Sequence, residues 1–281
     1  MKDKIALVTG ASSGIGRATV EALLAAGCTV FATARRMNRL ATLASRGARI
    51  LPLDVTDDVS MRTAVNNILA EVGRIDILIN NAGYGCYGSL EDVPMEDARR
   101  QFEVNLFGLA RLTQLVIPHM RQQRSGRIVN VTSVGAKIYG PLGSWYHASK
   151  YGVEGLSDCL RLELKPFGID VIMVEPAGTL TEWGGIATES LLKNSGHSDY
   201  AAAARGTVRI LHATENPRYA SPPKIVARGI LRALQARRPK ARYPLGKGAR
   251  LVVALRKFFS DRMMDGVIRL FLKIPSQPGS G

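Results

Sequence analysis

The stretch IALVTGASSGIG, residues 5–16, decides the fold of this chain. It begins with an apolar run of strand length, Ile5–Val8, and residues of helical composition follow it. Glycines between a strand and a helix let main-chain N–H groups approach a bound phosphate, because they carry no side chain that would block the approach. The stretch therefore predicts a strand, a phosphate-binding turn and a helix in that order.

The same alternation of strand and helix continues along the chain. Near-continuous apolar strands joined by helices are typical of a parallel sheet that is covered on both faces. We therefore predict a Rossmann-like, doubly wound α/β fold, with its ligand beyond the carboxyl ends of the strands. The expected strands cover residues 5–8, 29–33, 50–53, 75–79, 127–131, 170–174 and 242–245, and the expected helices cover 15–26, 59–72, 97–123, 145–166 and 224–237.

The pattern divides the chain into one domain and an extension. Residues 1–245 are predicted to form a single dinucleotide-binding domain, and 246–281 a basic, amphipathic helical extension that ends in a frayed tail over 275–281. Within the domain, residues 178–222 carry glycine and proline pairs and show only weak helical periodicity, around 189–193. We expect this segment to be a long, irregular substrate loop over the active site.

The net charge of +15 is concentrated near the C-terminus. From Lys224 onward there are 14 lysines and arginines against two acidic residues, so the rest of the chain is close to neutral. With no nucleic-acid-binding motif, this distribution argues against a nucleic-acid partner. Apolar residues at helical spacing in 251–271, with basic residues between them, leave two alternatives open. The extension either contacts an anionic membrane surface peripherally or packs on the core or on another subunit.

The N-terminus has no signal-peptide pattern, so we expect a cytoplasmic protein. The three cysteines and four histidines have none of the spacings that bind metals, and no metal site is expected.

Further motifs follow the glycine-rich turn. The spacing T-G-x-x-x-G-x-G from Thr9 to Gly16 resembles the short-chain dehydrogenase/reductase family. Asp-Val at 54–55, Asn-Asn-Ala-Gly at 80–83 and the Pro-containing segment 175–181 are similar to the segments that follow the third, fourth and sixth strands of that family. The resemblance implies that the dinucleotide contacts Gly10, Ser12, Ser13, Gly14, Ile15, Gly16, Arg35, Asp54, Val55, Asn81, Ala82, Gly83, Tyr146, Lys150, Pro176, Gly178, Thr179 and Thr181.

Four residues match the catalytic pattern of the family: Asn105, Ser133, Tyr146 and Lys150. Tyr146 and Lys150 are four residues apart and thus share one face of a helix. A nearby ammonium lowers the pKa of a phenol, so we expect Lys150 to lower that of Tyr146. The resemblance further implies that Tyr146 transfers the proton, Ser133 binds the substrate oxygen and Asn105 holds a water that links Lys150 to solvent.

The end of the second expected strand favours NADP(H), with NAD(H) as the alternative. An acidic residue there would bind the ribose 2′-hydroxyl of NAD and repel a 2′-phosphate. This chain has Ala34 in that place, and Arg35 follows with a guanidinium suited to phosphate.

Together these features predict an NADP(H)-dependent oxidoreductase that interconverts a carbonyl and an alcohol. The alternatives are an NAD-dependent alcohol or hydroxysteroid dehydrogenase and a non-catalytic dinucleotide-binding sensor. The resemblance extends to the hydroxysteroid and retinol dehydrogenase branch, and we expect a homo-oligomer. A lipophilic substrate is expected, because seven apolar or aromatic residues lie near the catalytic strand ends: Tyr84, Tyr87, Ile138, Tyr139, Leu142, Trp145 and Trp183.

Overall fold

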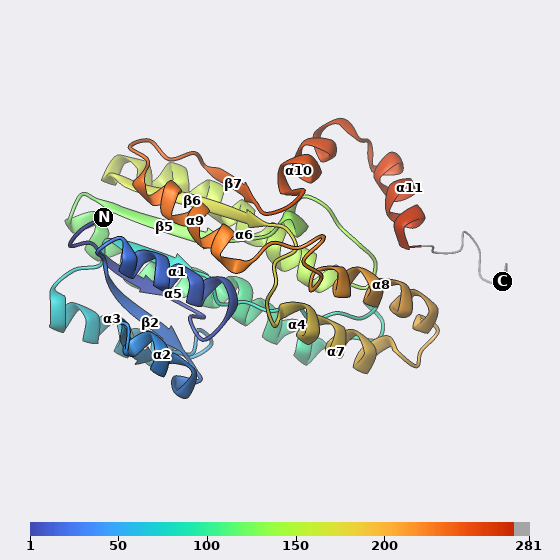
Figure 1. The fold of residues 1–281 in the computed structure, drawn as a ribbon, viewed down its shortest axis with the longest axis horizontal. Coiled ribbons are helices and arrows are strands. Elements are labelled where there is room, and N and C mark those ends of the chain that lie inside the picture. The colour runs from blue at the N-terminus through green and yellow to red at the C-terminus, as the bar shows by residue number, and fades with distance from the viewer. Residues whose placement is uncertain (273–281) are drawn as a thin grey trace.

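The computed structural model describes residues 1–272, without the side chains of 271 and 272; the expected frayed tail lies outside the described residues. Within this part of the chain, seven parallel strands form one central sheet (Figure 1) in the order β3-β2-β1-β4-β5-β6-β7. The strands are β1 (Ile5–Val8), β2 (Thr29–Ala34), β3 (Arg49–Pro52), β4 (Ile77–Asn80), β5 (Gly126–Val131), β6 (Ile169–Pro176) and β7 (Arg242–Leu245). The chain runs outward from β1 to β3 and then crosses back to β4, which opens a crevice at the carboxyl ends of β1 and β4.

Helices cover both faces of the sheet. One face packs against α1 and α9, and the other against α3, α5 and the end of α6, so each face has its own apolar core. The helices are α1 (Gly14–Ala25), α2 (Ala41–Ala44), α3 (Asp58–Val72), α4 (Met95–Phe102), α5 (Gly108–Gln122), α6 (Ser144–Leu164), α7 (Trp183–Ser195), α8 (Ala201–Ala213), α9 (Pro223–Gln235), α10 (Ala249–Phe258) and α11 (Asp261–Leu272). The predicted doubly wound α/β fold is confirmed.

Local sequence explains where these elements begin and end. Every residue of β1 and β4 is buried, as expected for strands inside a parallel sheet. The α3 helix begins where the Asp57 carboxylate accepts hydrogen bonds from the N–H groups of Val59 and Ser60, and it ends at Gly73, whose φ of +72° suits glycine.

Two segments differ from the sequence prediction. The expected single helix over 97–123 is interrupted by a π turn at Glu103–Phe107, which places Asn105 in the turn. The segment 178–222, expected to be irregular, instead contains α7 and α8, which pack side by side (Figure 1). Its glycines and polar residues obscure the helical period, and packing on neighbouring apolar residues overrides these weak local preferences.

The C-terminal helices α10 and α11 project beyond β7 and rise over α8 (Figure 1). These two helices form a C-terminal arm that contacts the loop between β5 and α6. The Tyr139 hydroxyl of that loop donates a hydrogen bond to the Asp265 carboxylate at 2.9 Å, and Met264 is buried. In the part of the chain that is described, every helix is too short or too polar to span a bilayer.

Candidate active site

A cavity of about 710 Å³ lies at the carboxyl ends of the strands and extends to α7 and α8. It is lined by residues from the glycine-rich turn, from the loops that follow β2 to β6, and from the two helices. Most of the predicted dinucleotide residues line it: Gly10, Ser12, Ser13, Gly14, Ile15, Arg35, Asp54, Val55, Asn81, Ala82, Gly83, Tyr146, Lys150, Pro176, Gly178, Thr179 and Thr181. Gly16 of the predicted dinucleotide set and Asn105 of the predicted catalytic set lie outside the lining.

The glycine-rich turn is held open by the loop after β4. The Thr9 hydroxyl accepts hydrogen bonds from the N–H groups of Asn81 and Ala82, both at 3.0 Å. The Asn81 amide in turn donates to the carbonyl oxygens of Thr9 and Gly10. Gly10 has a φ of +65°, and a Cβ there would lie 2.9 Å from the Ala82 Cα, so the turn has room only for main chain. The main chain of the turn is therefore positioned by contacts within the protein itself.

Arginines gather at the end of β2, on the rim of the cavity. Arg35 and Arg36 are exposed and line the cavity. The guanidinium of Arg36 lies 3.4 Å from Glu182 and that of Arg39 2.6 Å from the same carboxylate. Sequence reasoning missed Arg39 and Glu182, because 143 residues separate the partners and only the fold brings them together. Glu182 thus links the start of α7 to the rim where an adenine ribose phosphate is expected.

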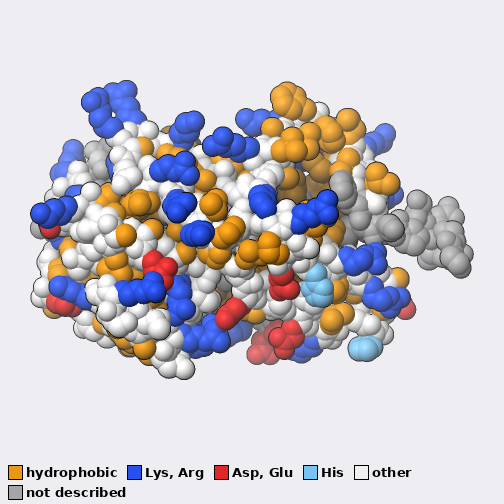
Figure 2. Space-filling view, in the orientation of Figure 1, with side chains coloured by type: hydrophobic (Ala, Val, Ile, Leu, Met, Phe, Trp, Pro, Cys, Tyr) orange, Lys and Arg blue, Asp and Glu red, His pale blue; other side chains and the backbone are white. Residues whose placement is uncertain are grey.

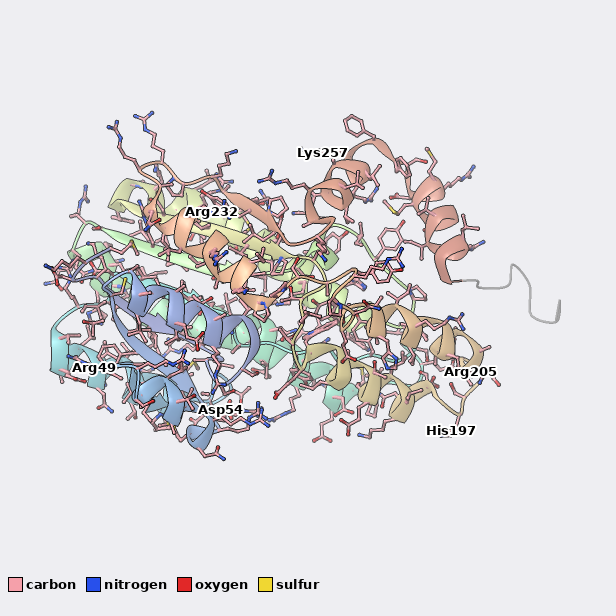
Figure 3. All side chains as sticks on the ribbon, viewed as in Figure 1. Arg49, Asp54, His197, Arg205, Arg232 and Lys257 are labelled. Carbon is pink, nitrogen blue, oxygen red and sulfur yellow. The ribbon has the colours of Figure 1, made fainter. Side chains whose placement is uncertain are left out.

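The loop after β3 is held by hydrogen bonds within the loop. The Asp54 carboxylate, labelled in Figure 3, accepts hydrogen bonds from the main-chain N–H and hydroxyl of Thr56 at 3.0 and 2.8 Å. The Asp54 N–H donates to the Ser60 hydroxyl at 3.0 Å. These contacts hold Asp54 and Val55 in the cavity wall, where the family resemblance places adenine contacts.

The three residues of the predicted catalytic set that line the cavity come from two elements. Ser133 follows β5, and its hydroxyl accepts a hydrogen bond from the Gly135 N–H at 2.9 Å. Tyr146 and Lys150 lie on successive turns of α6 and are both buried. The Lys150 ammonium donates a hydrogen bond to the Val131 carbonyl oxygen at 3.0 Å. The strand end and the helix therefore bring a hydroxyl, a phenol and an amine together, as the sequence predicted.

Burial affects the electrostatics of Tyr146 and Lys150. Burial raises the pKa of Tyr146 to about 12, and the neighbouring Ser133 hydroxyl lowers it only in part. Burial also lowers the pKa of Lys150 to about 8, against the opposing effect of Glu154. Burial is therefore the largest effect on the Tyr146 phenol, and a lowering of its pKa by Lys150 stays a prediction.

Asn105 acts from outside the cavity. Its side-chain oxygen accepts a hydrogen bond from the Tyr84 N–H at 3.0 Å. Its two N–H groups donate to the Tyr84 carbonyl oxygen and to the Ser149 hydroxyl, at 2.9 and 3.0 Å. The side chain therefore joins the loop after β4 to α6, beside Lys150.

An aromatic wall closes the substrate end of the cavity. The ring of Tyr146 lies 5.0 Å from that of Trp183 and 5.7 Å from that of Tyr87, measured between centroids. Of the seven residues that the sequence suggested for this lining, four are confirmed: Tyr84, Tyr87, Ile138 and Trp183.

Three of the expected lining residues point elsewhere. Tyr139 faces the C-terminal arm, where it bonds Asp265, and Leu142 is buried behind Tyr87. Trp145 packs on Phe102 in a separate apolar hollow. The reason is that neighbours on a helix or a loop point in different directions, so Trp145 and Tyr146 cannot both face the cavity.

Several lining residues were missed, mainly because α8 was not foreseen. Ile186 of α7 and Ile210, Leu211 and Thr214 at the end of α8 face the cavity. His147 also lines it; burial lowers its pKa, and its Nδ1 lies 2.7 Å from the Gly135 carbonyl oxygen. The position of His147 directly after Tyr146 was the one available signal. A neutral His147 donating to Gly135 braces the loop that carries Ser133.

Comparison with known proteins identifies the family of this chain. The model of the family described as short chain dehydrogenase matches residues 4–190. The chain is 34% identical over 275 residues to 3-ketodihydrosphingosine reductase from Bacteroides thetaiotaomicron, covering 98% of this chain and 100% of that protein. It is 31% identical to NADPH-dependent 3-dehydrocapnine reductase from Ornithobacterium rhinotracheale, covering 96% and 98% of the two chains. The crystal structure of a short-chain dehydrogenase from Streptomyces avermitilis is similar, with a TM-score of 0.79, 34% identity and coverage of 97% and 96%. This chain therefore belongs to the short-chain dehydrogenase family.

Proposed function

We propose that this protein is an NADPH-dependent reductase that converts a ketone on a lipid-like substrate to an alcohol, with Tyr146 as the proton donor. The observation that carries the proposal is the buried phenol of Tyr146 at the aromatic end of the cavity, which Ser133 and Lys150 also line. Reduction consumes a proton at the substrate oxygen, and a phenol with a raised pKa holds that proton at neutral pH. Oxidation would require the phenolate instead.

The cavity residues fit a dinucleotide. The main-chain cradle at Gly10 suits a pyrophosphate, and the exposed guanidinium of Arg35 suits a 2′-phosphate. When bound, the nicotinamide supplies the hydride that reaches the carbonyl carbon. The residues that would hold the cofactor are Gly10, Ser12, Ser13, Gly14 and Ile15 at the phosphates, Arg35 at the 2′-phosphate, Asp54, Val55 and Asn81–Gly83 at the adenosine, and Lys150, Pro176, Gly178, Thr179 and Thr181 at the nicotinamide half.

Side chains of the protein bind the substrate oxygen and supply its proton. The Ser133 hydroxyl donates a hydrogen bond to the substrate carbonyl oxygen and orients it toward Tyr146. The Tyr146 hydroxyl gives its proton to the same oxygen as negative charge develops there. The Lys150 ammonium stabilises the phenolate that remains, and Asn105 fixes the loop that packs beside Lys150.

Two observations support a lipid-like ketone. Tyr87, Trp183, Ile186 and Ile210 give the substrate end of the cavity an apolar wall that suits an alkyl chain. The two reductases described above carry names that specify 3-ketodihydrosphingosine and 3-dehydrocapnine as substrates, and both cover nearly the whole chain. We extend that substrate class, a 3-oxo group between a polar head and an alkyl chain, to this protein.

We also propose that the extension over 246–281, attached to the catalytic domain of 1–245, contacts an anionic membrane surface. The apolar side chains of Leu251, Phe258, Met263 and Leu270 are 63%, 82%, 53% and 78% exposed. Figure 2 shows hydrophobic side chains gathered over α10 and α11 with Lys and Arg at the edges, and Lys257 of α10 is labelled in Figure 3. Exposed apolar area beside positive charge is the combination that binds anionic bilayers. A lipid substrate would be available at that surface.

The test is a comparison of ketones. NADPH absorbance is followed with 3-ketodihydrosphingosine, with a short methyl ketone and with a bulky steroid ketone, each also with NADH. We expect turnover to be highest with the long-chain 3-oxo lipid and with NADPH. Turnover of the steroid alone would replace the proposed substrate class, and equal rates with NADH would remove the cofactor preference.

A further inference from the structure

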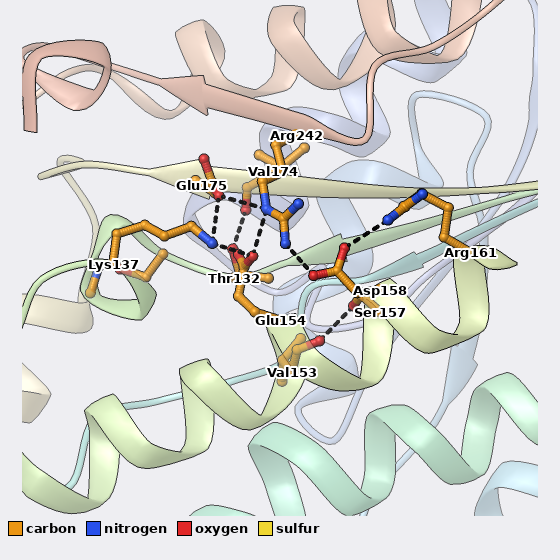
Figure 4. Close-up of polar contacts among 12 residues, drawn as sticks. Thr132, Lys137, Val153, Glu154, Ser157, Asp158, Arg161, Val174, Glu175 and Arg242 are labelled. Atoms are coloured by element: carbon orange, nitrogen blue, oxygen red, sulfur yellow. Dashed lines mark hydrogen bonds and ion pairs between the residues drawn. The ribbon is translucent and has the colours of Figure 1, made fainter. Parts of the chain in front are cut away.

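A buried cluster of charged residues lies between α6 and the strands β6 and β7 (Figure 4). The Glu154 carboxylate accepts hydrogen bonds from the Thr132 hydroxyl at 2.8 Å, from Lys137 at 2.6 Å and from Arg242 at 2.9 Å. Glu175 lies beside it on β6, 3.5 Å from both Lys137 and Arg242. Two acids thus share two cations in a place that is almost closed to water.

The two carboxyl groups have unequal surroundings. Both oxygens of Glu154 have close donors. Glu175 has a fully buried side chain, and within the described residues neither of its oxygens has a hydrogen-bond partner. A buried carboxylate without close donors costs free energy in its charged form. Burial, together with the charge of Glu154, therefore raises the pKa of Glu175. Glu154 is therefore the acid that binds the cluster together, and Glu175 is the acid whose charge the surroundings disfavour.

The cluster touches the two segments that carry Ser133, Tyr146 and Lys150. Glu154 follows Lys150 by one turn of α6, on the same face. Thr132 directly precedes Ser133, and Lys137 follows the short turn that Ser133 begins. Contacts of Glu154 with Thr132 and Lys137 thus tie the Ser133 loop to the helix that bears Tyr146.

We propose that Glu154 is a positioning residue for the reductase reaction: its carboxylate keeps Lys150 in the ammonium form and holds the Ser133 loop against α6. The inference rests on the proposed function for its kinetic readout, but its electrostatic part does not depend on catalysis. Lys150 is faced by Tyr146 of its own helix and by the Val131 carbonyl oxygen of β5, and Glu154 is the acid that raises its pKa.

The charges around Glu154 come from three further elements. Lys137 lies in the Ser133 loop, Arg242 on β7 and Glu175 on β6, and Asp158 on the next turn of α6 also binds Arg242. The cations offset the charge of Glu154. Removing one of them should therefore let Glu154 raise the pKa of Lys150 further. Loss of Glu154 is therefore expected to lower the pKa of Lys150, and loss of Lys137 to raise it.

The experiment compares Glu154→Gln with Lys137→Gln, and Asp158→Asn serves as the control that alters the cluster two turns away from Lys150. The readout is the pH profile of kcat with NADPH, beside KM and thermal unfolding. We expect Glu154→Gln to move the high-pH limb down by about one pH unit, because Lys150 loses its proton more easily. Lys137→Gln is expected to move the limb up, and Asp158→Asn to leave it in place.

A second readout does not require turnover. NMR of the protein with ¹⁵N-labelled lysine follows the Lys150 Nζ through its titration, and Lys150→Met identifies the resonance. Shifts of opposite sign in the two variants support the proposal even if the wild type reduces no ketone, which would contradict only the proposed function. Unchanged titration of Lys150 in both variants, or shifts in the same direction, overturns it. If Glu154→Gln does not fold, the upward shift in Lys137→Gln decides.

Discussion

The indole of Trp183 lies 5.0 Å from the phenol ring of Tyr146, which joins the first residue of α7 to the proposed proton donor. Tyr87 completes the contact, with its ring 5.9 Å from that of Trp183. The start of α7 therefore packs directly on the proposed proton donor. A substrate chain packed on Trp183 would therefore lie beside Tyr146.

Substitution of Trp183 tests this alignment. Trp183→Leu is expected to raise KM for the long-chain ketone roughly tenfold, because the substrate loses an aromatic surface. Trp145→Leu is the matched control, since Trp145 packs on Phe102 outside the cavity. Steady-state kinetics of both variants provide the measurement. Equal effects on KM would show that Trp183 acts through general stability and not through the substrate.

Arg35 is expected to read the cofactor phosphate. Its exposed guanidinium lines the cavity after β2, so Arg35→Ala should weaken NADPH binding by about 1.5 to 3 kcal/mol, the loss of a charge-assisted hydrogen bond. NADH binding should change little, because it has no 2′-phosphate. Fluorescence titrations with both cofactors check this. Arg46→Ala, which alters an arginine paired with Glu21 on the surface, is the control. Equal weakening of NADH binding would show that Arg35 does not contact the 2′-phosphate.

The fold could be predicted from sequence where a pattern is local. Strands such as Ile5–Val8 and Ile77–Asn80 are apolar throughout because both faces of the sheet are covered. Tyr146 and Lys150 converge with Ser133 because a helical spacing of four and a strand end both follow from short motifs. Those parts of the site needed no knowledge of distant contacts.

The remainder depends on contacts between distant residues. The pairing of Arg39 with Glu182 joins segments that no local pattern relates. The α8 residue Leu211 faces the cavity only because α8 packs on α7. The raised pKa of Tyr146 reflects burial, which spacing alone does not reveal. Sequence therefore identified the candidate catalytic groups but not how burial affects them.

Asp76 gives a prediction about stability and pH. It is buried before β4 and accepts hydrogen bonds from the Ile5 N–H at 2.9 Å, from Lys4 at 3.1 Å and from Arg74. Burial opposes its charge, but these bonds prevail and lower its pKa. A lowered folded pKa means that the stabilisation is present above the unfolded pKa and is lost as the pH falls through the folded value.

Asp76→Asn should therefore lower the free energy of unfolding at pH 7 by about 1 to 3 kcal/mol. The difference from the wild type should shrink as the solution is made more acidic. Urea unfolding at several pH values measures both. A difference that stays constant from neutral to acidic pH would contradict the account of Asp76.

The membrane proposal predicts a measurable change in vesicle binding. Co-sedimentation of the full chain should rise with the fraction of anionic phospholipid and fall with salt. The double variant Phe258→Ser, Leu270→Ser should lose most of this binding, because both side chains are largely exposed. Leu162→Ser, at an exposed position of α6, is the control. Absence of binding to every vesicle would leave packing between subunits as the better explanation of the apolar surface.

The most direct measurement is the rate of NADPH consumption with 3-ketodihydrosphingosine for the wild type and for Tyr146→Phe. The variant lacks only the hydroxyl that donates the proton, so NADPH binding measured by fluorescence should be retained. We expect the wild type to turn over and kcat of the variant to fall by about a thousandfold. Turnover by Tyr146→Phe at the wild-type rate would contradict the role of Tyr146 as the proton donor.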